Sequence, residues 1–365
     1  MPNMLTLVVG ARPNFMKAAP LMESIAARQR FTARLVHTGQ HFDANMSQIF
    51  FEQLGLPQPD VYLNIQGGSP AEQIGRMVLE LEKEFQNHQP EMVVVFGDVN
   101  STLAAAVVAN KLNLPLAHVE AGLRSFDRSM PEEHNRIVTD MLADVLFTPS
   151  PDGDENLLRE GVAAERIFRV GNIMVDSLKR FQPVAEALAA WETFGLPRGR
   201  YGLITLHRPA NVDDVEILRG LVDVLVQIQK DAPLIFPVHP RTREKLRTQQ
   251  LLAPLEQAGV LVAEPIGYLE FLSLMTQARF VLTDSGGIQE ETTMLGVPCL
   301  TARENTERPI TISQGTNRLV GNRPEGILEG YRHLQAAPTQ PIHPELWDGQ
   351  TALRIEEILA AKLLK

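Results

Sequence analysis

Residues 280–291 have the sequence FVLTDSGGIQEE. The apolar start predicts a buried strand, the small residues at 285–287 predict a turn, and the rest predicts a helix. Backbone N–H groups in such a turn can approach an anion closely, and the N-terminus of the helix adds roughly half a positive charge. Glu290 and Glu291, one turn into the helix, favour a neutral hydroxylated partner such as a ribose. The stretch therefore predicts a nucleoside diphosphate site, with an ordinary turn between strand and helix as the alternative.

The composition is that of a folded protein with more than one domain. The chain has 365 residues, 44% of them hydrophobic and 21% charged, and this length exceeds a comfortable single core. A formal net charge of −10 argues against the basic surface that a nucleic-acid partner requires. No segment has the roughly 18 consecutive apolar residues of a membrane span, and the N-terminus does not resemble a signal peptide. We expect a cytoplasmic protein with no nucleic-acid or membrane partner.

The cysteine and histidine contents argue against a metal centre. Cys299 is the single cysteine, which excludes an intramolecular disulfide, and its apolar neighbours predict a buried thiol in a strand. His37 and His41 lie four residues apart, but the residues between them predict a loop, so we expect no metal site. Neither a G-x-G-x-x-G motif after the first strand nor a P-loop motif occurs. We therefore expect no metal and no cofactor.

Short apolar strands alternate with amphipathic helices through both halves of the chain. Strands are expected at 5–9, 33–37, 92–96, 116–119 and 145–148, and again at 201–205, 234–238, 260–262, 280–283 and 299–301. Continuous apolar strands separated by helices predict parallel sheets covered on both faces. A helical segment at about 169–196 predicts the hinge between two domains. We thus predict an α/β protein with two doubly wound, Rossmann-like domains facing across a cleft, with ligands at the carboxyl ends of the strands.

Charged residues follow the predicted strands of the first half. The carboxylates are Asp98, Glu120 and Glu132, and the cations are Arg12 and Lys17. Because the carboxyl ends of parallel strands meet at one edge of a sheet, we expect these five side chains to gather there. Three carboxylates and two cations at one edge indicate a functional site.

Structural alternatives exist for each of these residues. Asp98 could cap the helix that follows it. Glu132 could interact only with the dipole of its helix, which is the role that we expect for Glu133. Glu120 has the weakest structural explanation, because it ends an apolar strand and would be half buried without a purpose. The two cations could be ordinary surface charges.

Two histidines follow strands in the second half of the chain, His207 before Arg208 and His239 before Pro240. A histidine at the end of a strand can carry a proton or donate a hydrogen bond to a phosphate. A hydrogen-bonded structural histidine is the alternative at both positions.

A series of motifs occurs in a fixed order along the chain. They are GARPNFMK at 10–17, HTGQH at 37–41, GD at 97–98, HVEAGLR at 118–124, PEEHNR at 131–136, HR at 207–208, TDSGGIQEE at 283–291 and TERP at 306–309. In this order they resemble the motifs of the non-hydrolysing UDP-N-acetylglucosamine 2-epimerases. The resemblance implies a fold of the glycosyltransferase-B type, a homodimer, and a C-terminal helix that returns to the first domain. We expect residues 1–170 and 351–365 in the first domain and 171–350 in the second.

This family is made up of isomerases that invert C2 of a UDP-linked 2-acetamido sugar, converting UDP-GlcNAc to UDP-ManNAc for polysaccharide biosynthesis. The resemblance implies elimination of UDP to 2-acetamidoglucal, followed by re-addition of UDP after C2 is protonated on the other face. The C2 hydrogen is acidified by departure of UDP and by charge at C1. One carboxylate can therefore act as the base while a second stabilises that charge.

The family's catalytic residues correspond by position to four residues of this chain. We assign Asp98 as the C2 base and Glu120 as its partner acid or base. Glu132 is expected to orient groups or stabilise charge, and His207 to donate to the leaving phosphate.

The substrate-binding residues expected from the motifs and the resemblance lie in both domains. They are Arg12, Lys17, Arg124, Arg136, Arg208, His239, Phe271, Ser285, Gly286, Gly287, Glu291 and Arg308. Glu291 corresponds to the family's ribose-binding carboxylate and Phe271 to the aromatic residue beside the uracil.

The sequence also departs from the common bacterial form of the family. That form has G-T-R-P-E and H-R-R-E motifs, where this chain has Ala11, Asn14, Pro209 and Ala210. In the regulated members the last glutamate contributes to a second, activating UDP-sugar site, and an arginine stands in the loop that corresponds to residues 66–68. We therefore predict weak or absent activation by substrate.

Two alternative functions remain open. Residues 37–55 also resemble a branch of the family that acts on UDP-2,3-diacetamido-2,3-dideoxyglucuronate. The alternative from another class is a UDP-sugar glycosyltransferase of the same fold. Three carboxylates at the reaction edge exceed what a simple transferase requires, which counts against the transferase.

Overall fold

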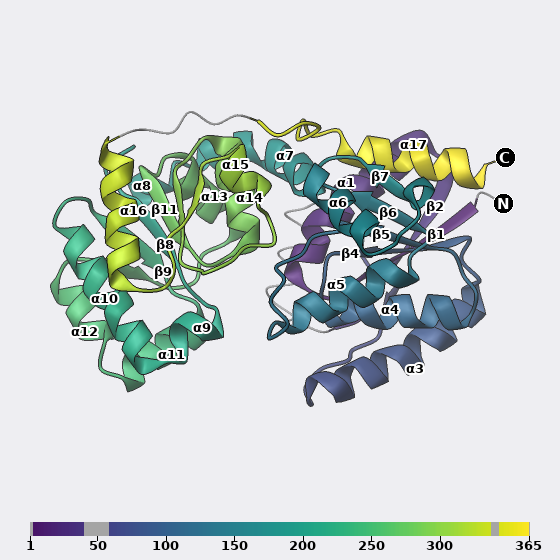
Figure 1. Ribbon diagram of the computed structural model, residues 1–365, viewed down its shortest axis with the longest axis horizontal. Coiled ribbons are helices and arrows are strands. Elements are labelled where there is room, and N and C mark those ends of the chain that lie inside the picture. The colour runs from purple at the N-terminus through teal and green to yellow at the C-terminus, as the bar shows by residue number, and fades with distance from the viewer. Residues whose placement is uncertain (1–2, 40–57, 337–342, 365) are drawn as a thin grey trace. The chain divides into compact units, whose positions relative to one another are not determined.

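The computed structural model describes residues 3–39, 58–336 and 343–364 (Figure 1). The chain forms two compact units. Unit 1 comprises Met1–Ser177 and Glu345–Lys365, and unit 2 comprises Leu178–Pro344. His41 lies outside the described residues.

Unit 1 is built on a parallel sheet which, among the described residues, has seven strands in the order β3-β2-β1-β4-β5-β6-β7. The strands are β1 (Asn3–Val9), β2 (Phe31–His37), β3 (Val61–Tyr62), β4 (Met92–Phe96), β5 (Leu116–Val119), β6 (Val145–Thr148) and β7 (Ile167–Arg169). The strand order reverses between β1 and β4, so the carboxyl edge there is the expected place for a ligand. The five strands expected in the first half are confirmed, and β3 and β7 were not predicted.

Helices cover both faces of this sheet. They are α1 (Arg12–Arg28), α3 (Pro70–His88), α4 (Asn100–Lys111), α5 (Pro131–Leu142), α6 (Pro151–Arg159), the 3-10 turn η1 (Ala164–Arg166), the start of α7 (Ile173–Leu188), and α17 (Thr351–Leu363). Figure 1 shows α3, α4 and α5 on one face and α1 with α17 on the other. Proline is the first residue of α3, α5 and α6, where its missing N–H has no intrahelical partner to lose.

Unit 2 contains a second parallel sheet, with six strands in the order β10-β9-β8-β11-β12-β13 within the described ranges. They are β8 (Gly202–Thr205), β9 (Leu234–Pro237), β10 (Leu261–Ala263), β11 (Phe280–Thr283), β12 (Cys299–Thr301) and β13 (Asn317–Leu319). The predicted α/β class with two parallel sheets is confirmed. Cys299 is buried in β12 as expected, and burial raises the pKa of its thiol to about 11.

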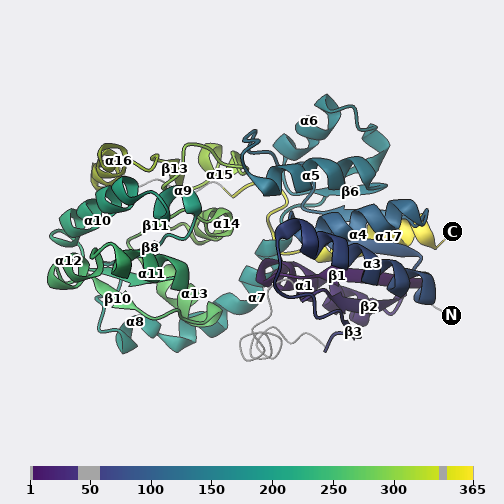
Figure 2. The same ribbon diagram turned by 90° about the horizontal axis from the view of Figure 1, so that it is seen from below.

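The helices of unit 2 also lie on both faces of their sheet. They are α8 (Ala190–Thr193), α9 (Pro209–Val212), α10 (Val215–Gln229), α11 (Pro240–Thr248), α12 (Leu252–Gln257), α13 (Tyr268–Thr276), α14 (Gly286–Leu295), α15 (Ile310–Ser313) and α16 (Pro324–Ala336). A large apolar core lies between the sheet and helices α10 and α16, which pack on each other (Figure 2). This core fixes the strand ends that carry the candidate site.

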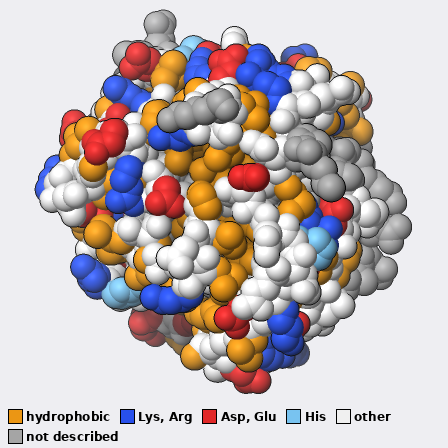
Figure 3. All heavy atoms as spheres, turned by 90° about the vertical axis from the view of Figure 1, so that its right-hand side faces the viewer, with side chains coloured by type: hydrophobic (Ala, Val, Ile, Leu, Met, Phe, Trp, Pro, Cys, Tyr) orange, Lys and Arg blue, Asp and Glu red, His pale blue; other side chains and the backbone are white. Residues whose placement is uncertain are grey.

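The surface carries charges of both signs. Figure 3 shows acidic and basic side chains interspersed with hydrophobic ones over the face of unit 1 that it presents. Among the described residues, no helix has the length and the apolar content needed to cross a bilayer.

Candidate active site

Asp98 stands at the carboxyl end of β4 and is held by an arginine. Gly97 before it has a φ of +61°, a left-handed conformation that glycine adopts at little cost. Asp98 Oδ2 accepts hydrogen bonds from Nε and Nη2 of Arg136 at 3.0 and 2.6 Å, and 28% of the Asp98 side chain is exposed. The N-cap of α4 is Val99, with no side-chain cap. The N-cap is thus the residue after Asp98, while the Asp98 carboxylate binds Arg136.

Glu120 ends β5 in a left-handed backbone conformation, with a φ of +73°. For a residue other than glycine this conformation costs about 1–2 kcal/mol, and such strain is concentrated at functional sites. The N–H groups of Glu120 and Ala121 both donate to the carbonyl oxygen of Phe147 at 3.0 Å, which holds the turn. The Glu120 carboxylate forms an ion pair with Lys17 of α1, and both residues are buried. Glu120 is thus a buried carboxylate that is paired with a lysine and held in a strained backbone conformation.

The turn before Asp98 packs directly against this ion pair. A Cβ atom built on Gly97 would lie 2.7 Å from Nζ of Lys17 and 3.1 Å from Oε2 of Glu120. The structure therefore brings Asp98, Glu120 and Lys17 together at one edge of the unit 1 sheet. Arg12 begins α1, but its side chain lies outside the described part of the structure.

Glu132 and Glu133 lie in the first turn of α5 and differ in burial. Glu132 is exposed. Glu133 is buried and accepts hydrogen bonds from the N–H and Oγ of Ser125 at 3.0 Å and from the N–H of Phe126 at 2.8 Å. Its carboxylate also binds Nη1 of Arg136 at 2.6 Å. The expectation that Glu133 only meets the helix dipole is wrong, because it anchors a loop and the arginine that holds Asp98.

Arg124 is engaged within unit 1. Its Nη1 lies 2.7 Å from Oδ2 of Asp140, and its Nε and Nη2 donate to Glu160 at 2.8 and 2.6 Å. Burial disfavours the charged guanidinium, but the two carboxylates outweigh it and raise the pKa of Arg124 above its ordinary value. A role for Arg124 in holding substrate stays a prediction.

Asp284, at the end of β11, organises the predicted histidine of unit 2. Its buried carboxylate accepts from the N–H groups of His207 and Arg208, each at 2.9 Å, and from Nδ2 of Asn211 at 3.0 Å. Its Oδ1 lies 2.8 Å from Nδ1 of His207. Burial alone would raise the pKa of Asp284, but His207 and the N–H donors outweigh burial and lower it. Asp284 was not predicted as a site residue. Its position in the sequence, between a buried strand and the small residues at 285–287, could have indicated it.

The two predicted histidines of unit 2 are neighbours. The ring centroids of His207 and His239 are 6.1 Å apart. The His239 side chain caps α11 by accepting from the N–H of Arg241 at 3.3 Å. Burial lowers the pKa of His239, and the nearby charges of His207 and Arg241 act in the same direction. With 41% of its side chain exposed, His207 can contact a ligand while Asp284 fixes its orientation.

The turn at residues 285–287 begins α14 as the sequence indicated. A Cβ atom on Gly286 would lie 2.5 Å from Oε1 of Glu307 and 2.6 Å from Nη1 of Arg308, whereas a Cβ atom on Gly287 would meet nothing within 4 Å. Ser285 is the N-cap and makes no side-chain cap. The N-terminus of α14 therefore has the features of an anion site.

A cluster of arginines surrounds Glu307 beside this turn. Glu307 binds Nη2 of Arg303 at 2.7 Å and Nη1 of Arg308 at 2.5 Å, and Nη2 of Arg208 lies 3.8 Å away. Nε of Arg308 pairs with Glu290 at 2.8 Å. Three arginines against two glutamates leave the cluster positively charged, which suits a diphosphate. Arg303 and Glu307 were missed as site residues, although both lie in or beside the TERP motif.

Glu291 lies on α14 and is tied to α13. Its Oε1 accepts a hydrogen bond from the hydroxyl of Tyr268 at 2.9 Å. Phe271 lies on the same helix as Tyr268, three residues further along, and is partly buried. The predicted ribose carboxylate and the predicted uracil neighbour are thus carried by two connected helices.

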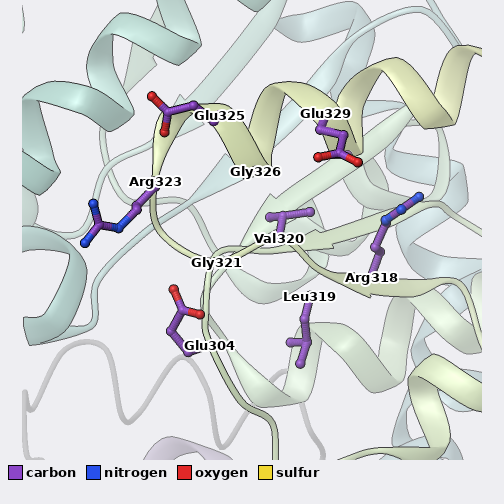
Figure 4. Close-up of a pocket in the computed structure, with 10 residues that line it drawn as sticks. Glu304, Arg318, Leu319, Val320, Gly321, Arg323, Glu325, Gly326 and Glu329 are labelled. Atoms are coloured by element: carbon purple, nitrogen blue, oxygen red, sulfur yellow. The ribbon is translucent and has the colours of Figure 1, made fainter.

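The pocket shown in Figure 4 has a volume of about 440 Å³ and lies between β13 and α16 of unit 2. Charged side chains of both signs line it, including Glu304, Arg318, Arg323 and Glu329. Among the described side chains, none of those predicted for the site lines this pocket.

The chain is similar to known epimerases over almost its full length. The family model for UDP-N-acetylglucosamine 2-epimerase matches residues 23–360. The chain belongs to this family. The UDP-N-acetylglucosamine 2-epimerase of Methanocaldococcus jannaschii is 44% identical over 361 residues, which cover 97% of this chain and 98% of that protein. The UDP-2,3-diacetamido-2,3-dideoxy-D-glucuronate 2-epimerase of Pseudomonas aeruginosa is also 44% identical, over 97% of this chain and 98% of that protein.

Solved structures of the family agree with the fold. The crystal structure of the M. jannaschii enzyme in complex with UDP-GlcNAc and UDP has a TM-score of 0.90 and 41% identity, and covers 98% of this chain and 99% of its own. The epimerase from Neisseria meningitidis bound to UDP-GlcNAc also has a TM-score of 0.90, with 29% identity over 98% of this chain and all of its own. The resemblance inferred from the ordered motifs is confirmed, as is the glycosyltransferase-B type of fold.

Proposed function

We propose that this protein inverts C2 of a UDP-2-acetamido sugar, interconverting UDP-GlcNAc and UDP-ManNAc. The observation that carries the proposal is the pair of carboxylates at one sheet edge, Asp98 held by Arg136 and Glu120 held by Lys17. Two relatives at 44% identity are named as 2-epimerases of UDP-sugars, which supports this role for the two carboxylates.

In the first half-reaction Asp98 removes the hydrogen of C2 as the bond between C1 and the β-phosphate oxygen breaks. The products are UDP and 2-acetamidoglucal, with the proton on Asp98. Positive charge develops at C1, and carboxylates stabilise such charge. In the second half-reaction Glu120, which has taken up a proton from solvent, gives that proton to C2 on the opposite face, and the phosphate oxygen bonds to C1 again. Asp98 then releases its proton to solvent, so one proton enters and one leaves in each cycle. Glu132 is assigned to orient groups during it.

The leaving UDP must be retained for the second half-reaction. We assign the diphosphate to the N–H groups at the start of α14 and to Arg208 and Arg308 beside them. His207, oriented by Asp284, donates to the departing phosphate. Exclusion of water protects the unsaturated intermediate from side reactions.

Incorporation of solvent deuterium tests the proposal. Incubated with UDP-GlcNAc in D2O, the enzyme is expected to place deuterium at C2 of both epimers, which proton NMR detects as loss of the C2 signal. A UDP-sugar transferase requires an acceptor and leaves C2 untouched, so absence of exchange with every UDP-2-acetamido sugar would reject the proposal.

The 2,3-diacetamido uronate is the alternative substrate. One observation supports this alternative. The UDP-2,3-diacetamido-2,3-dideoxy-D-glucuronate 2-epimerase of P. aeruginosa is as similar to this chain as the M. jannaschii enzyme. The same exchange assay with both UDP-sugars decides between them, since only the accepted substrate exchanges at C2 with a low KM.

Glu291→Ala is expected to weaken UDP binding by about 1–3 kcal/mol, the usual cost of leaving a buried hydrogen-bonding partner unsatisfied. The group left without a partner is the hydroxyl of the ribose. Calorimetric titration with UDP measures the change in Kd. Tyr268→Phe is the graded control, because it removes the hydrogen bond from Tyr268 to Glu291 and keeps the Glu291 carboxylate, so it should cost less. An unchanged Kd in Glu291→Ala would contradict the assignment.

We further propose that activation by substrate is weak or absent, because Ala210 has no side chain that can accept a hydrogen bond. Initial rates in the manno-to-gluco direction are expected to follow a hyperbola. Clear sigmoidicity would reject this prediction. Ala210→Glu is the matched variant, since it restores the carboxylate of the regulated members.

We also propose a homodimer, as the family resemblance implied. Exposed apolar side chains on α3 and α5, two helices that both pack on α4, support it, namely Leu79 on α3 and Val138 and Met141 on α5. Light scattering is expected to give twice the chain mass, and Met141→Glu to shift it toward the monomer.

A further inference from the structure

One buried face of α5 carries three charged side chains. Glu133, Arg136 and Asp140 are all buried, and their spacing of three and four residues places them on the same side of a helix. Glu133 anchors the preceding loop, and Arg136 holds Asp98. Asp140 has no part in the proposed chemistry, so its contacts require a separate explanation.

Asp140 connects two turns through a histidine. Its Oδ1 lies 2.6 Å from Nδ1 of His118, and its Oδ2 accepts from the N–H of Gly122 at 3.1 Å. On the other side of the ring, Nε2 of His118 lies 2.8 Å from the carbonyl oxygen of Gly97. Asp140 and His118 are fully buried. A continuous line of hydrogen bonds therefore runs from Gly122 to Gly97.

The partners of His118 determine where its hydrogens lie. The carbonyl oxygen of Gly97 can only accept, so Nε2 donates to it. Oδ2 of Asp140 lies 2.7 Å from Nη1 of Arg124 and accepts from the N–H of Gly122, and both contacts favour the ionised carboxylate. An ionised Asp140 can only accept as well, so Nδ1 also donates. A ring that donates from both nitrogens is an imidazolium.

We infer that His118 and Asp140 form a buried imidazolium–carboxylate pair that positions both proposed catalytic carboxylates. One end of the pair holds the carbonyl group immediately before Asp98. The other end holds the N–H of Gly122, two residues after Glu120. The pair thereby fixes the spacing of the two carboxylates, which a reaction at one carbon requires. This inference rests on the proposed function.

Charges around the pair are balanced on each side. Asp140 also contacts Arg124, which in turn binds Glu160. Beside Gly97 lie Lys17 and the Glu120 carboxylate. These charged groups come from α1, the turn after β5 and the end of α6. Each cation there has an anion as its partner, so the pair can stay ionised inside the unit.

The hydrogens of His118 can be observed in the unmodified protein. A proton–nitrogen NMR spectrum of the histidine-labelled enzyme is expected to show two exchange-protected N–H protons on this ring. His118→Gln identifies the signals by their loss. A single N–H proton on His118 at neutral pH would overturn the inference.

Asp140→Asn tests the positioning role. The amide puts an NH2 group where Gly122 and Arg124 need an acceptor, so the two turns shift. We expect kcat for C2 exchange to fall by about 10²-fold, the typical cost of a small misplacement of reacting groups. The Kd for UDP should not change, because the residues assigned to UDP are in unit 2. One protected N–H proton of His118 should be lost as well.

Asp144→Asn is the matched control. Asp144 accepts from the N–H of Leu116 at 2.9 Å, at the opposite end of the same strand β5. The Asp144→Asn variant should leave kcat and the His118 signals unchanged. Equal losses of kcat in both variants, or an unchanged kcat in folded Asp140→Asn, would overturn the inference. A native enzyme without C2 exchange would reject the proposed function instead, and the N–H protons of His118 would still decide the pair.

Discussion

Asp98→Asn is expected to abolish exchange of the C2 hydrogen while UDP still binds. Asparagine has nearly the same shape as aspartate, but its amide cannot take a proton from C2. Loss of a general base costs about 10²–10⁴-fold in rate. Proton NMR in D2O measures the exchange with UDP-GlcNAc, and calorimetric titration measures the Kd for UDP. Loss of UDP affinity with exchange intact would contradict the assignment.

A second aspartate provides the control for this variant. Asp214 caps α10 by accepting from the N–H groups of Glu216 and Ile217, and asparagine caps a helix about as well as aspartate. Asp214→Asn should therefore retain both the fold and the exchange rate. If it slowed exchange as much as Asp98→Asn, the loss would not report on a catalytic base.

Local sequence was sufficient for the strands that are fully buried. β4 has the bounds that its continuous apolar run predicted, and every residue in it is buried. The last helix, α17, likewise lies within residues 351–365, where a C-terminal helix was expected. In such segments the periodicity and the burial agree, so the pattern alone identifies the element.

Short strands at the edges were missed because their pairing is not a local property. β3 has two residues, and β7 and β13 have three each. β13 reads Asn317-Arg318-Leu319 and becomes a strand by pairing with β12 in parallel register. The neighbouring strand supplies its hydrogen bonds, and sequence alone does not show that neighbour.

The candidate site was predictable to the extent that topology places strand ends together. That argument located Asp98 and Glu120 at one edge. The same argument could not identify Glu133, Asp140 and Glu307. Charged residues are expected at the surface unless they are buried together with a partner of opposite charge. Those partners are remote in sequence in two cases, His118 for Asp140 and Arg208 for Glu307. Glu133 differs from its exposed neighbour Glu132 only by its angle around α5.

Lys17→Met is expected to destabilise unit 1 by about 3–5 kcal/mol, the usual cost of removing one partner from a buried ion pair. Methionine keeps most of the length of the lysine side chain but leaves the buried Glu120 carboxylate without this cation. Urea denaturation at neutral pH, followed by circular dichroism, measures the free energy of unfolding. Lys83→Met is the matched control, because Lys83 pairs with Glu80 at the surface, where such a pair is worth at most about 1 kcal/mol.

A double variant separates the buried charge from the packing of the lysine chain. Combined with Lys17→Met, Glu120→Gly removes the carboxylate and also relieves the left-handed backbone at position 120, which costs about 1–2 kcal/mol for a side chain other than glycine. The double variant should therefore be more stable than Lys17→Met alone, although it should not invert C2. If both were equally unstable, the loss would come from packing, and the ion pair would not be what holds Glu120 in its strained turn.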